Sequence, residues 1–153
     1  GLCVLQVLRA DGATEVVIID PRPGRRALAA RLGATATHAG VDNSAAKGAA
    51  FDLAFDCTGS PEGPGVATAT VRKGASDVLV GLPTGPSTHD FLDTVLREIT
   101  LIGSVGHLPD VDCRRAVDLI ASGWRGVEAR LGRLEQGLDA AAVELPTAAR
   151  EAA

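Results

Sequence analysis

The chain of 153 residues is long enough for one domain with a substantial core, because single domains commonly run to about 100–200 residues. Its 46% apolar and 22% charged residues form an ordinary globular balance, which excludes a low-complexity tail. The formal charge of −4 is spread along the chain and aromatic residues are only 3%, so nucleic acid is not expected as a partner. No apolar run is long enough to span a membrane and the first residues lack a secretion signal, so we expect a cytoplasmic protein.

Helix patterns and strand patterns alternate along the first part of the chain. Leucine recurs at threefold spacing in residues 2–10, which predicts a largely buried helix. The unbroken β-branched run 16–19 is typical of a parallel strand covered on both faces, and it stops at Asp20. The next expected elements are a turn over 21–24, a helix over 25–32, a brief edge strand over 34–38, a polar connection over 42–50 and a strand over 51–56.

The same alternation continues to the last part of the chain. Pro64 and Gly65 are expected to delay the next helix, so that it runs only over 66–72, and Asp110 is expected to cap a helix over 111–122. Crossover connections between strands imply a parallel sheet, so we predict an α/β, Rossmann-like, doubly wound fold. The other expected elements are a buried strand over 78–80, a short exposed strand over 89–92, a core strand over 101–105 and a weakly ordered tail over 143–153.

Asp20 marks the end of a strand, and doubly wound sheets bind their ligands beyond the carboxyl ends of the strands. An acidic residue there accepts hydrogen bonds from the adenosine ribose and repels a 2′-phosphate, which favours NAD over NADP. Asp20 could equally cap the turn before Pro21, and both roles stay open. Arg22, Arg25 and Arg26 follow it; they are either solvated, near the ribose, or partners of a 2′-phosphate, which keeps NADP open.

Gly1 opens an apolar helix that leads into the strand ending at Asp20. A phosphate-binding turn needs Gly-x-Gly-x-x-Gly, and only its last glycine matches Gly1, so we expect the first strand and the turn itself to precede this sequence. Small residues at two other strand ends let the backbone approach a flat ring, although each is also a reasonable structural turn. These ends are Cys57-Thr58-Gly59 and Gly81-Leu82-Pro83.

Metal-binding and nucleophilic motifs are missing from the sequence. The three histidines and three cysteines include no pair at a ligand spacing such as Cys-x-x-Cys, so no metal site is expected. Neither a Gly-x-Ser-x-Gly elbow nor a Ser-His-Asp order is present, and no catalytic residue is predicted. The chemistry that the protein serves is therefore expected to lie outside these residues.

Several segments together resemble the medium-chain, zinc-dependent alcohol and polyol dehydrogenases, which include sorbitol, threonine and butanediol types. The resemblance covers residues 1–142 and implies one cofactor domain over 1–153 that lacks its first strand. The zinc-bearing catalytic domain of the family has no counterpart in the sequence. The segments that carry the resemblance are GLCVLQVLRADGA, VVIIDPRPGRRALAARLGA, FDLAFDCTGSPE, VRKGASDVLVGLP, VLREITLIGSVG and CRRAVDLIASG.

Taken residue by residue, the resemblance implies an NAD site. Gly1 would pack beside the pyrophosphate, and Asp20 and Arg25 would bind the adenosine ribose. The segment 89–92 matches an edge strand that pairs between subunits in many members, which implies a homodimer or homotetramer. The adenosine side would be completed by Cys57, Thr58 and Gly59, and the nicotinamide end by Gly81, Leu82, Pro83 and Ser104.

The resemblance also implies an activity for the parent protein. It would oxidise a secondary alcohol or polyol, with zinc in another domain polarising the alcohol oxygen and NAD receiving the hydride. This chain would position the cofactor and would be inactive alone. Two alternatives stay open: a non-catalytic nucleotide-binding or dimerisation module, and part of a zinc-free quinone-reductase-like enzyme that uses NADPH.

Overall fold

The computed structural model describes residues 1–41, 51–106 and 108–121, and the chain divides into two compact units. The first unit is Gly1–His107 and the second is Leu108–Ala153. In the described ranges no helix is both long and apolar enough to cross a membrane. The predicted connection over 42–50 and the tail over 143–153 lie outside the described residues.

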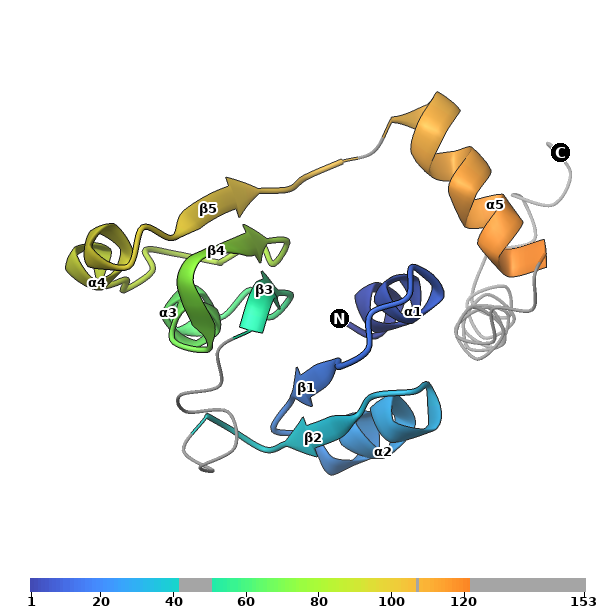
Figure 1. The fold of residues 1–153 in the computed structure, drawn as a ribbon, viewed down its shortest axis with the longest axis horizontal. Coiled ribbons are helices and arrows are strands. Elements are labelled where there is room, and N and C mark those ends of the chain that lie inside the picture. Colours follow the sequence, from blue (N-terminus) through green and yellow to red (C-terminus); the bar gives the residue numbers. More distant parts are fainter. Residues whose placement is uncertain (42–50, 107, 122–153) are drawn as a thin grey trace, which may run out of the picture. The chain divides into compact units, whose positions relative to one another are not determined.

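The first unit opens with a helix that packs on a small parallel sheet of two strands, β1 and β2 (Figure 1). Leu5, Val16 and Ala29 form its buried cluster. The second helix begins two residues earlier than predicted, because Pro23 suits a first turn, where no N–H donor is needed. The elements are α1 (Leu2–Ala10), β1 (Val17–Ile19), α2 (Pro23–Arg31) and β2 (Ala36–His38).

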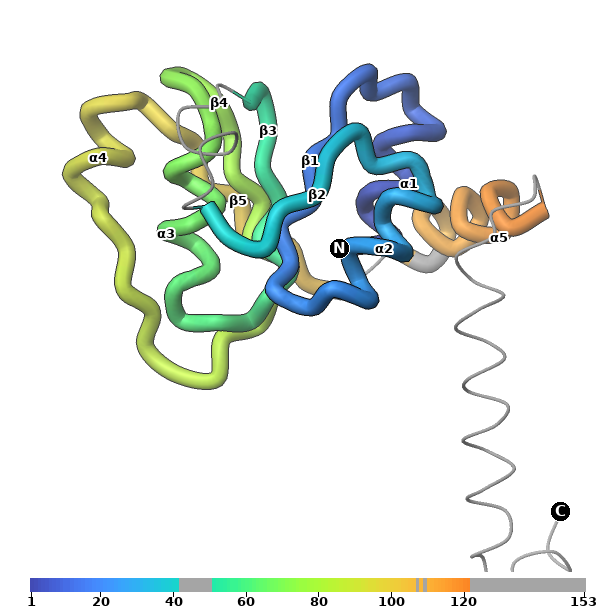
Figure 2. The backbone as a smooth tube through the Cα atoms, turned by 90° about the horizontal axis from the view of Figure 1, so that it is seen from below, coloured from blue at the N-terminus to red at the C-terminus, as the bar shows by residue number. Residues whose placement is uncertain are grey.

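A second parallel sheet has the strand order β3-β4-β5, and α3 packs against β3 and β4 (Figure 2). Its core is formed by Val71, Ala75 and Ile99. Parallel strands joined through helices confirm the predicted α/β, Rossmann-like class. The elements are β3 (Phe51–Asp56), α3 (Gly63–Thr68), β4 (Val71–Leu79), α4 (Phe91–Leu96) and β5 (Thr100–Gly103).

The helix predicted over 66–72 is wrong at both ends. It begins at Gly63, because Pro64 falls in the first turn, where proline is tolerated. It ends at Thr68, and residues 71–79 continue as β4, which is longer than the predicted strand over 78–80. The guanidinium of Arg97 stabilises this helix-to-strand junction by donating to the carbonyl oxygens of Thr68 and Val71 at 2.6 and 2.7 Å.

The short strand predicted over 89–92 is also wrong, because Phe91 and Leu92 begin α4 and the two residues before them form no strand. Asp90 is the N-cap, and its carboxylate accepts a hydrogen bond from the N–H of Asp93 at 3.1 Å. Capping residues override the weak strand pattern of so short a segment. Residues 89–92 therefore form no strand that could pair between subunits as expected.

Two strands are less buried than their apolar sequences predict. β5 covers residues 100–103 instead of the predicted 101–105 and lies at an edge of its sheet, with Ile102 43% exposed. The residues of β1 are only half-buried, although their β-branched run predicts cover on both faces. Among the described residues, β1 and β5 each lie at the edge of a sheet, which leaves their side chains partly open to solvent.

The second unit begins with a π-helical turn, Pro109–Cys113, which continues into α5 (Arg114–Ala121). Its N-cap is Leu108 instead of the predicted Asp110. The N–H of Leu108 donates to the carboxylate of Asp112 at 2.6 Å. With this cap the helix begins at Pro109, two residues before the predicted start at residue 111. The predicted end of this helix at residue 122 lies outside the described residues.

Candidate functional site at the strand ends

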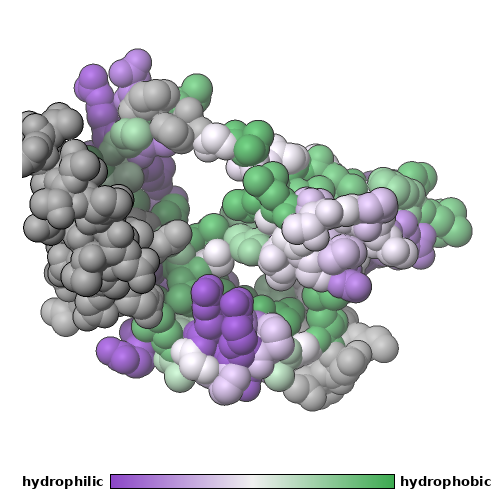
Figure 3. Space-filling view, turned by 180° about the vertical axis from the view of Figure 1, so that it is seen from behind, coloured by the Kyte–Doolittle hydropathy of each residue, from purple (hydrophilic) through white to green (hydrophobic). Residues whose placement is uncertain are grey.

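A cavity of about 760 Å³ in the first unit follows β1 and β3 along their length. Protein interiors contain few voids larger than a water molecule, so a space of this size is not a packing defect. It falls within the range of small-molecule sites, roughly 300–1,000 Å³. Hydrophobic side chains are open to solvent on the face seen in Figure 3, and Leu53 and Val66, which line the cavity, are about 40% exposed.

The predicted polar residues gather where the strands finish. Asp20 follows β1, Cys57 and Thr58 follow β3, and all three line the cavity together with Gly1 and Arg25. A Cβ at Gly1 would lie 3.8 Å from the Cβ of Cys57, so the start of α1 lies beside the end of β3. The free N–H groups at a helix start favour an anion there. The structure therefore brings five of the ten predicted site residues to one cavity.

Asp20 is held by its neighbour Arg22. The guanidinium of Arg22 donates to both carboxylate oxygens at 2.9 Å, and its backbone N–H donates to one of them at 2.9 Å. The Arg22 side chain holds the pKa of the Asp20 carboxyl below its usual value, against the opposing effect of partial burial. A carboxylate has about four acceptor sites, so Asp20 caps its turn and still has room for a hydroxyl.

Asp56, which is not among the residues predicted from sequence motifs, fixes the turn that follows β3. Its side chain is only 4% exposed, and one carboxylate oxygen accepts from the N–H and the hydroxyl of Thr58 at 2.9 and 2.7 Å. A Cβ at Gly63 would lie 2.6 Å from both carboxylate oxygens, so only glycine fits beside them. An Asp at a strand end followed by Thr two residues later is the pattern of an Asx turn, which is the signal that could have identified it.

The turns after β3 and β4 touch each other next to the cavity. A Cβ at Gly81 would collide with the backbone N of Gly59 and would lie 2.9 Å from the N of Thr58. A Cβ at Gly59 would lie 2.8 Å from the carbonyl oxygen of Leu82, and Gly59 has a φ of +69°. The remaining predicted residues do not line the cavity: Gly59, Gly81 and Leu82 adjoin it, whereas Pro83 and Ser104 are exposed at the ends of their segments.

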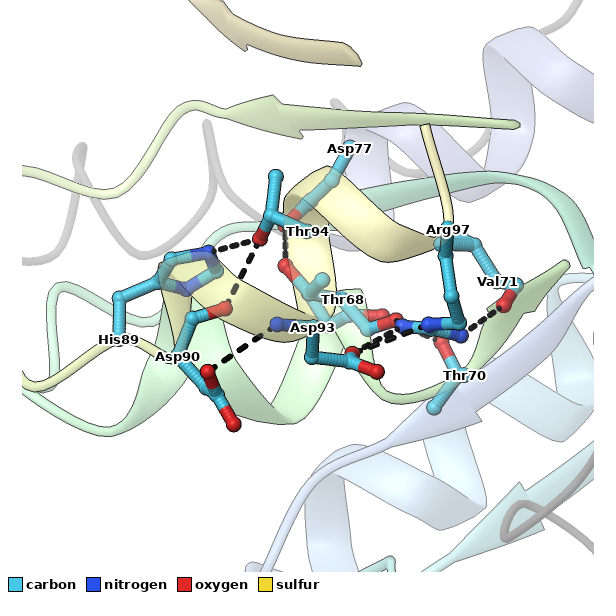
Figure 4. Close-up of polar contacts among 10 residues, drawn as sticks. Thr68, Thr70, Val71, Asp77, His89, Asp90, Asp93, Thr94 and Arg97 are labelled. Atoms are coloured by element: carbon cyan, nitrogen blue, oxygen red, sulfur yellow. Dashed lines mark hydrogen bonds and ion pairs between the residues drawn. The ribbon is translucent and has the colours of Figure 1, made fainter. Parts of the chain in front are cut away.

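Asp77 on β4 is a buried carboxylate that does not line the cavity, and Figure 4 shows it beside Thr68. Asp77 is fully buried; the hydroxyl of Thr68 donates to one of its oxygens at 3.0 Å, and the other has no partner among the described residues. Burial raises the pKa of Asp77, the charge of Asp56 raises it further, and the Thr68 hydrogen bond and His89 oppose the rise. An acidic residue inside a strand has no sequence signal for burial, so it was missed.

The matching family model is described as zinc-binding dehydrogenase, and it covers residues 1–122. The chain belongs to the zinc-binding dehydrogenase family. Its relatives include geraniol dehydrogenase of Castellaniella defragrans, 38% identical over 66% of this chain and 30% of that protein. L-threonine 3-dehydrogenase of Bacillus velezensis is 29% identical over 80% of this chain and 38% of that protein. This member of the family thus spans about a third of the length of the relatives it matches, and the predicted family is confirmed.

Solved structures of dehydrogenases match the fold of this chain. Benzyl alcohol dehydrogenase of Acinetobacter calcoaceticus is 26% identical with a TM-score of 0.71, over 80% of this chain and 37% of that one. A zinc-binding dehydrogenase of Sinorhizobium meliloti, solved bound to NADP, is 27% identical with a TM-score of 0.70, over 80% and 38% of the two chains. These likenesses support the Rossmann-like assignment.

The zinc named in the family description has no set of ligands in the part of the chain that the structure describes. No group of three or more His, Cys, Asp or Glu side chains there could hold a metal ion. The described side chains therefore do not fit a zinc ion, and no step of the function proposed below passes through one.

Proposed function

We propose that this chain holds a nicotinamide dinucleotide for an oxidoreductase that transfers a hydride between an alcohol or polyol and that cofactor. The observation that carries the proposal is the convergence of Gly1, Asp20, Cys57 and Thr58 on one cavity at the ends of parallel strands. The bound dinucleotide supplies the hydride chemistry. Relatives described as geraniol and threonine dehydrogenases support an alcohol as the class of substrate.

The described residues would divide the work of binding. The start of α1 at Gly1 would place its N–H groups toward the pyrophosphate. Asp20 would accept from a ribose hydroxyl, with Arg25 alongside, and the turn at Cys57 and Thr58 would form the wall of the adenosine pocket. Gly81, Leu82, Pro83 and Ser104 would serve the nicotinamide end of the same sheet edge, beyond the described cavity.

Asp20 makes NAD the preferred cofactor in this proposal, because a carboxylate repels a 2′-phosphate. NADPH is the second candidate, and a specific contact favours it. Arg22 already neutralises Asp20 and presents a guanidinium at the same strand end, where a 2′-phosphate would be bound. The zinc-binding dehydrogenase of Sinorhizobium meliloti, which was solved bound to NADP, supports this second candidate.

Titration with NADH and with NADPH, followed by fluorescence of the reduced nicotinamide, tests the proposal. We expect NADH to bind more tightly than NADPH, and Asp20→Asn to reduce NADH affinity by roughly tenfold, because a charge-assisted hydrogen bond is lost. The matched control is Asp52→Asn, since Asp52 is an exposed carboxylate that does not line the cavity. Equal loss with both variants, or binding of neither nucleotide, would contradict the proposal.

The same proposal places the protein in the cytoplasm. Cys3, Cys57 and Cys113 are free thiols, and Cys3 and Cys113 are exposed. Exposed thiols persist in a reducing compartment. A homo-oligomer remains part of the proposal, but it requires an interface other than strand pairing at residues 89–92.

A further inference from the structure

Arg26 binds the backbone at the end of β1 and does not line the cavity. Its Nη1 donates to the carbonyl oxygens of Asp20 and Pro21, each at 2.8 Å. Arg26 is half-buried, whereas its exposed neighbour Arg25 belongs to the cavity lining. The two adjacent arginines therefore have different roles. Arg25 is available to a ligand in the cavity, and Arg26 is engaged with the chain itself.

The place of Arg26 on α2 explains how it reaches the strand end. Its N–H donates to the carbonyl oxygen of the N-cap residue Arg22 at 3.2 Å, so Arg26 closes the first turn of the helix. Side chains of a helix lean toward the helix start, which brings this guanidinium back over the turn. The helix dipole disfavours a cation there, and the first turn of α2 contains no acidic residue. The two carbonyl oxygens offset this effect by accepting its hydrogen bonds.

The backbone leaves the sheet at Asp20. The N–H of Asp20 donates to the carbonyl oxygen of His38 on β2 at 3.0 Å, and the next residue, Pro21, has no N–H to donate. A residue has two soft backbone dihedral angles, so the peptide planes before and after it set the direction of its side chain. His38 holds the plane before Asp20, and Arg26 holds the plane after it. The direction of the Asp20 carboxylate therefore depends on both contacts.

Arg22 cannot replace Arg26 in this role. It donates to the Asp20 carboxylate at 2.9 Å, but it belongs to the same turn and its side chain is 63% exposed. A contact within a turn moves with that turn. Arg26 instead connects the turn to α2, which is anchored in the buried cluster by Ala29. Arg26 thus ties the position of Asp20 to the packed part of the unit.

We propose that Arg26 is a positioning residue for recognition of the adenosine ribose, because it ties the turn that carries Asp20 to α2 and so keeps the carboxylate at the cavity. The inference rests on the proposed function, in which Asp20 accepts from a ribose hydroxyl. The guanidinium of Arg26 is bound to the backbone and lies outside the cavity lining, so Arg26 is not a partner of a 2′-phosphate. Its effect on the cofactor passes through Asp20.

Dissociation constants of NADH, NADPH and ADP-ribose for variants of the 153-residue chain test the proposal, and isothermal titration measures them. Arg26→Ala removes both hydrogen bonds to the turn. Arg26→Lys keeps one nitrogen atom that can donate to both carbonyl oxygens, as Nη1 does. Arg31→Ala is the control, because Arg31 is an exposed arginine of the same helix that does not line the cavity. Arg26→Ala is also made together with Asp20→Ala, where no carboxylate is left to position.

We expect Arg26→Ala to weaken binding of NADH and ADP-ribose by roughly fivefold, because a displaced carboxylate no longer accepts from the ribose. NADPH affinity should change by less than about twofold, since the same displacement reduces repulsion of the 2′-phosphate. Arg26→Lys should bind NADH within about twofold of the unaltered chain, as should Arg31→Ala. Added to Asp20→Ala, Arg26→Ala should weaken NADH binding by less than about twofold.

A measurement without nucleotide reports the position of the Asp20 carboxylate directly. The N–H and the Nε–H of Arg22 both donate to its Oδ1 at 2.9 Å, and heteronuclear NMR follows their exchange with water. Both should exchange faster in Arg26→Ala. The N–H of Asp93, which donates to Asp90 at the start of α4, should exchange at an unchanged rate. Faster exchange at both places would mean a general loss of stability and would overturn the positioning role.

The binding results separate this inference from the function on which it rests. NADH binding that Arg26→Ala leaves unchanged would overturn the inference alone. A selective loss of NADPH binding in Arg26→Ala would also overturn it, because Arg26 would then be a partner of the 2′-phosphate. An undiminished loss of NADH binding in the Asp20→Ala background would show that Arg26 does not act through Asp20. No binding of NADH by the unaltered chain would overturn the proposed function and this inference together.

Discussion

Gly63 lies against the carboxylate of Asp56, so closely that a methyl group in place of its hydrogen would lie 2.6 Å from both oxygens. The same methyl would collide with the hydroxyl of Thr58, which donates to that carboxylate. The start of α3 and the turn after β3 are therefore packed through a hydrogen-bonded group that has little freedom to move. This contact couples the helix to the wall of the candidate cofactor site.

Gly63→Ala is expected to destabilise the protein by about 1–3 kcal/mol, because the added methyl must displace a buried carboxylate and its hydrogen bonds. Urea unfolding followed by circular dichroism measures the change. The matched control is Gly65→Ala in the same helix, where a Cβ would lie 3.6 Å from the carbonyl oxygen of Thr88. That distance is an ordinary contact, so the control should change stability by less than about 1 kcal/mol. Similar losses for the two variants would contradict the close packing of Gly63.

Arg22→Ala is expected to increase the preference for NADH over NADPH by roughly fivefold to tenfold. The substitution releases both carboxylate oxygens of Asp20 and removes a guanidinium that favours a 2′-phosphate. Isothermal titration with each nucleotide measures the ratio of dissociation constants. Arg31→Ala is the control, because Arg31 is an exposed arginine at the end of α2 that does not line the cavity. An unchanged ratio in Arg22→Ala would show that Arg22 has no part in cofactor choice.

Arg97→Ala is expected to destabilise the protein by about 2–3 kcal/mol. The guanidinium donates to the carbonyl oxygens of Thr68 and Val71 and pairs with Asp93 at 2.8 Å, and its side chain is only 26% exposed. Without the guanidinium, these partly buried carbonyl oxygens lose a charged hydrogen-bond donor, which costs stability. Arg72→Ala is the control, since the Arg72–Asp52 pair is exposed and should contribute at most about 1 kcal/mol. Urea unfolding midpoints, compared at constant m-value, measure the loss of stability in each variant. A loss in Arg97→Ala as small as that in Arg72→Ala would show that Arg97 does not stabilise the junction between α3 and β4.

Asp77→Asn is expected to stabilise the protein at neutral pH and to lose this advantage in acid. Burial raises the folded-state pKa of Asp77 above the ordinary 3.8, so the unfolded chain gives up this proton at lower pH than the folded chain does. Between those two values the folded state holds more protons, and stability falls as pH rises. Below 3.8 the group is protonated in both states and its contribution no longer changes.

Urea unfolding at intervals from pH 3.5 to 8 measures this difference between Asp77→Asn and the unaltered chain. Asp52→Asn serves as the control, because its carboxylate is 85% exposed. The gap between Asp77→Asn and the unaltered chain should widen as pH rises through the folded-state pKa. A gap that is constant with pH would mean that the charge of Asp77 is not the cause.

Local pattern was sufficient for the existence and order of the elements within the described residues 1–41 and 51–56. The leucine spacing of α1 and the β-branched run of β1 report periodicity, which depends on neighbours along the chain. The strand over residues 51–56 was predicted with the bounds that it has. Further along, the sequence predicts that Pro64 delays a helix, whereas Pro64 lies in the first turn of that helix, because proline disrupts a helix interior and is tolerated at a helix start. The sequence pattern also predicts a strand where Asp90 caps α4.

The sequence by itself determined the α/β class and the family, because those follow from periodicity and from motifs read in order, and it predicted the strand ends at which a cofactor would bind. The tertiary structure alone decided which residues meet: Arg22 contacts Asp20, Gly63 lies against Asp56, and β1 and β3 line one cavity. Such contacts depend on how distant segments pack and on which backbone groups find a partner, and neither is encoded in local spacing.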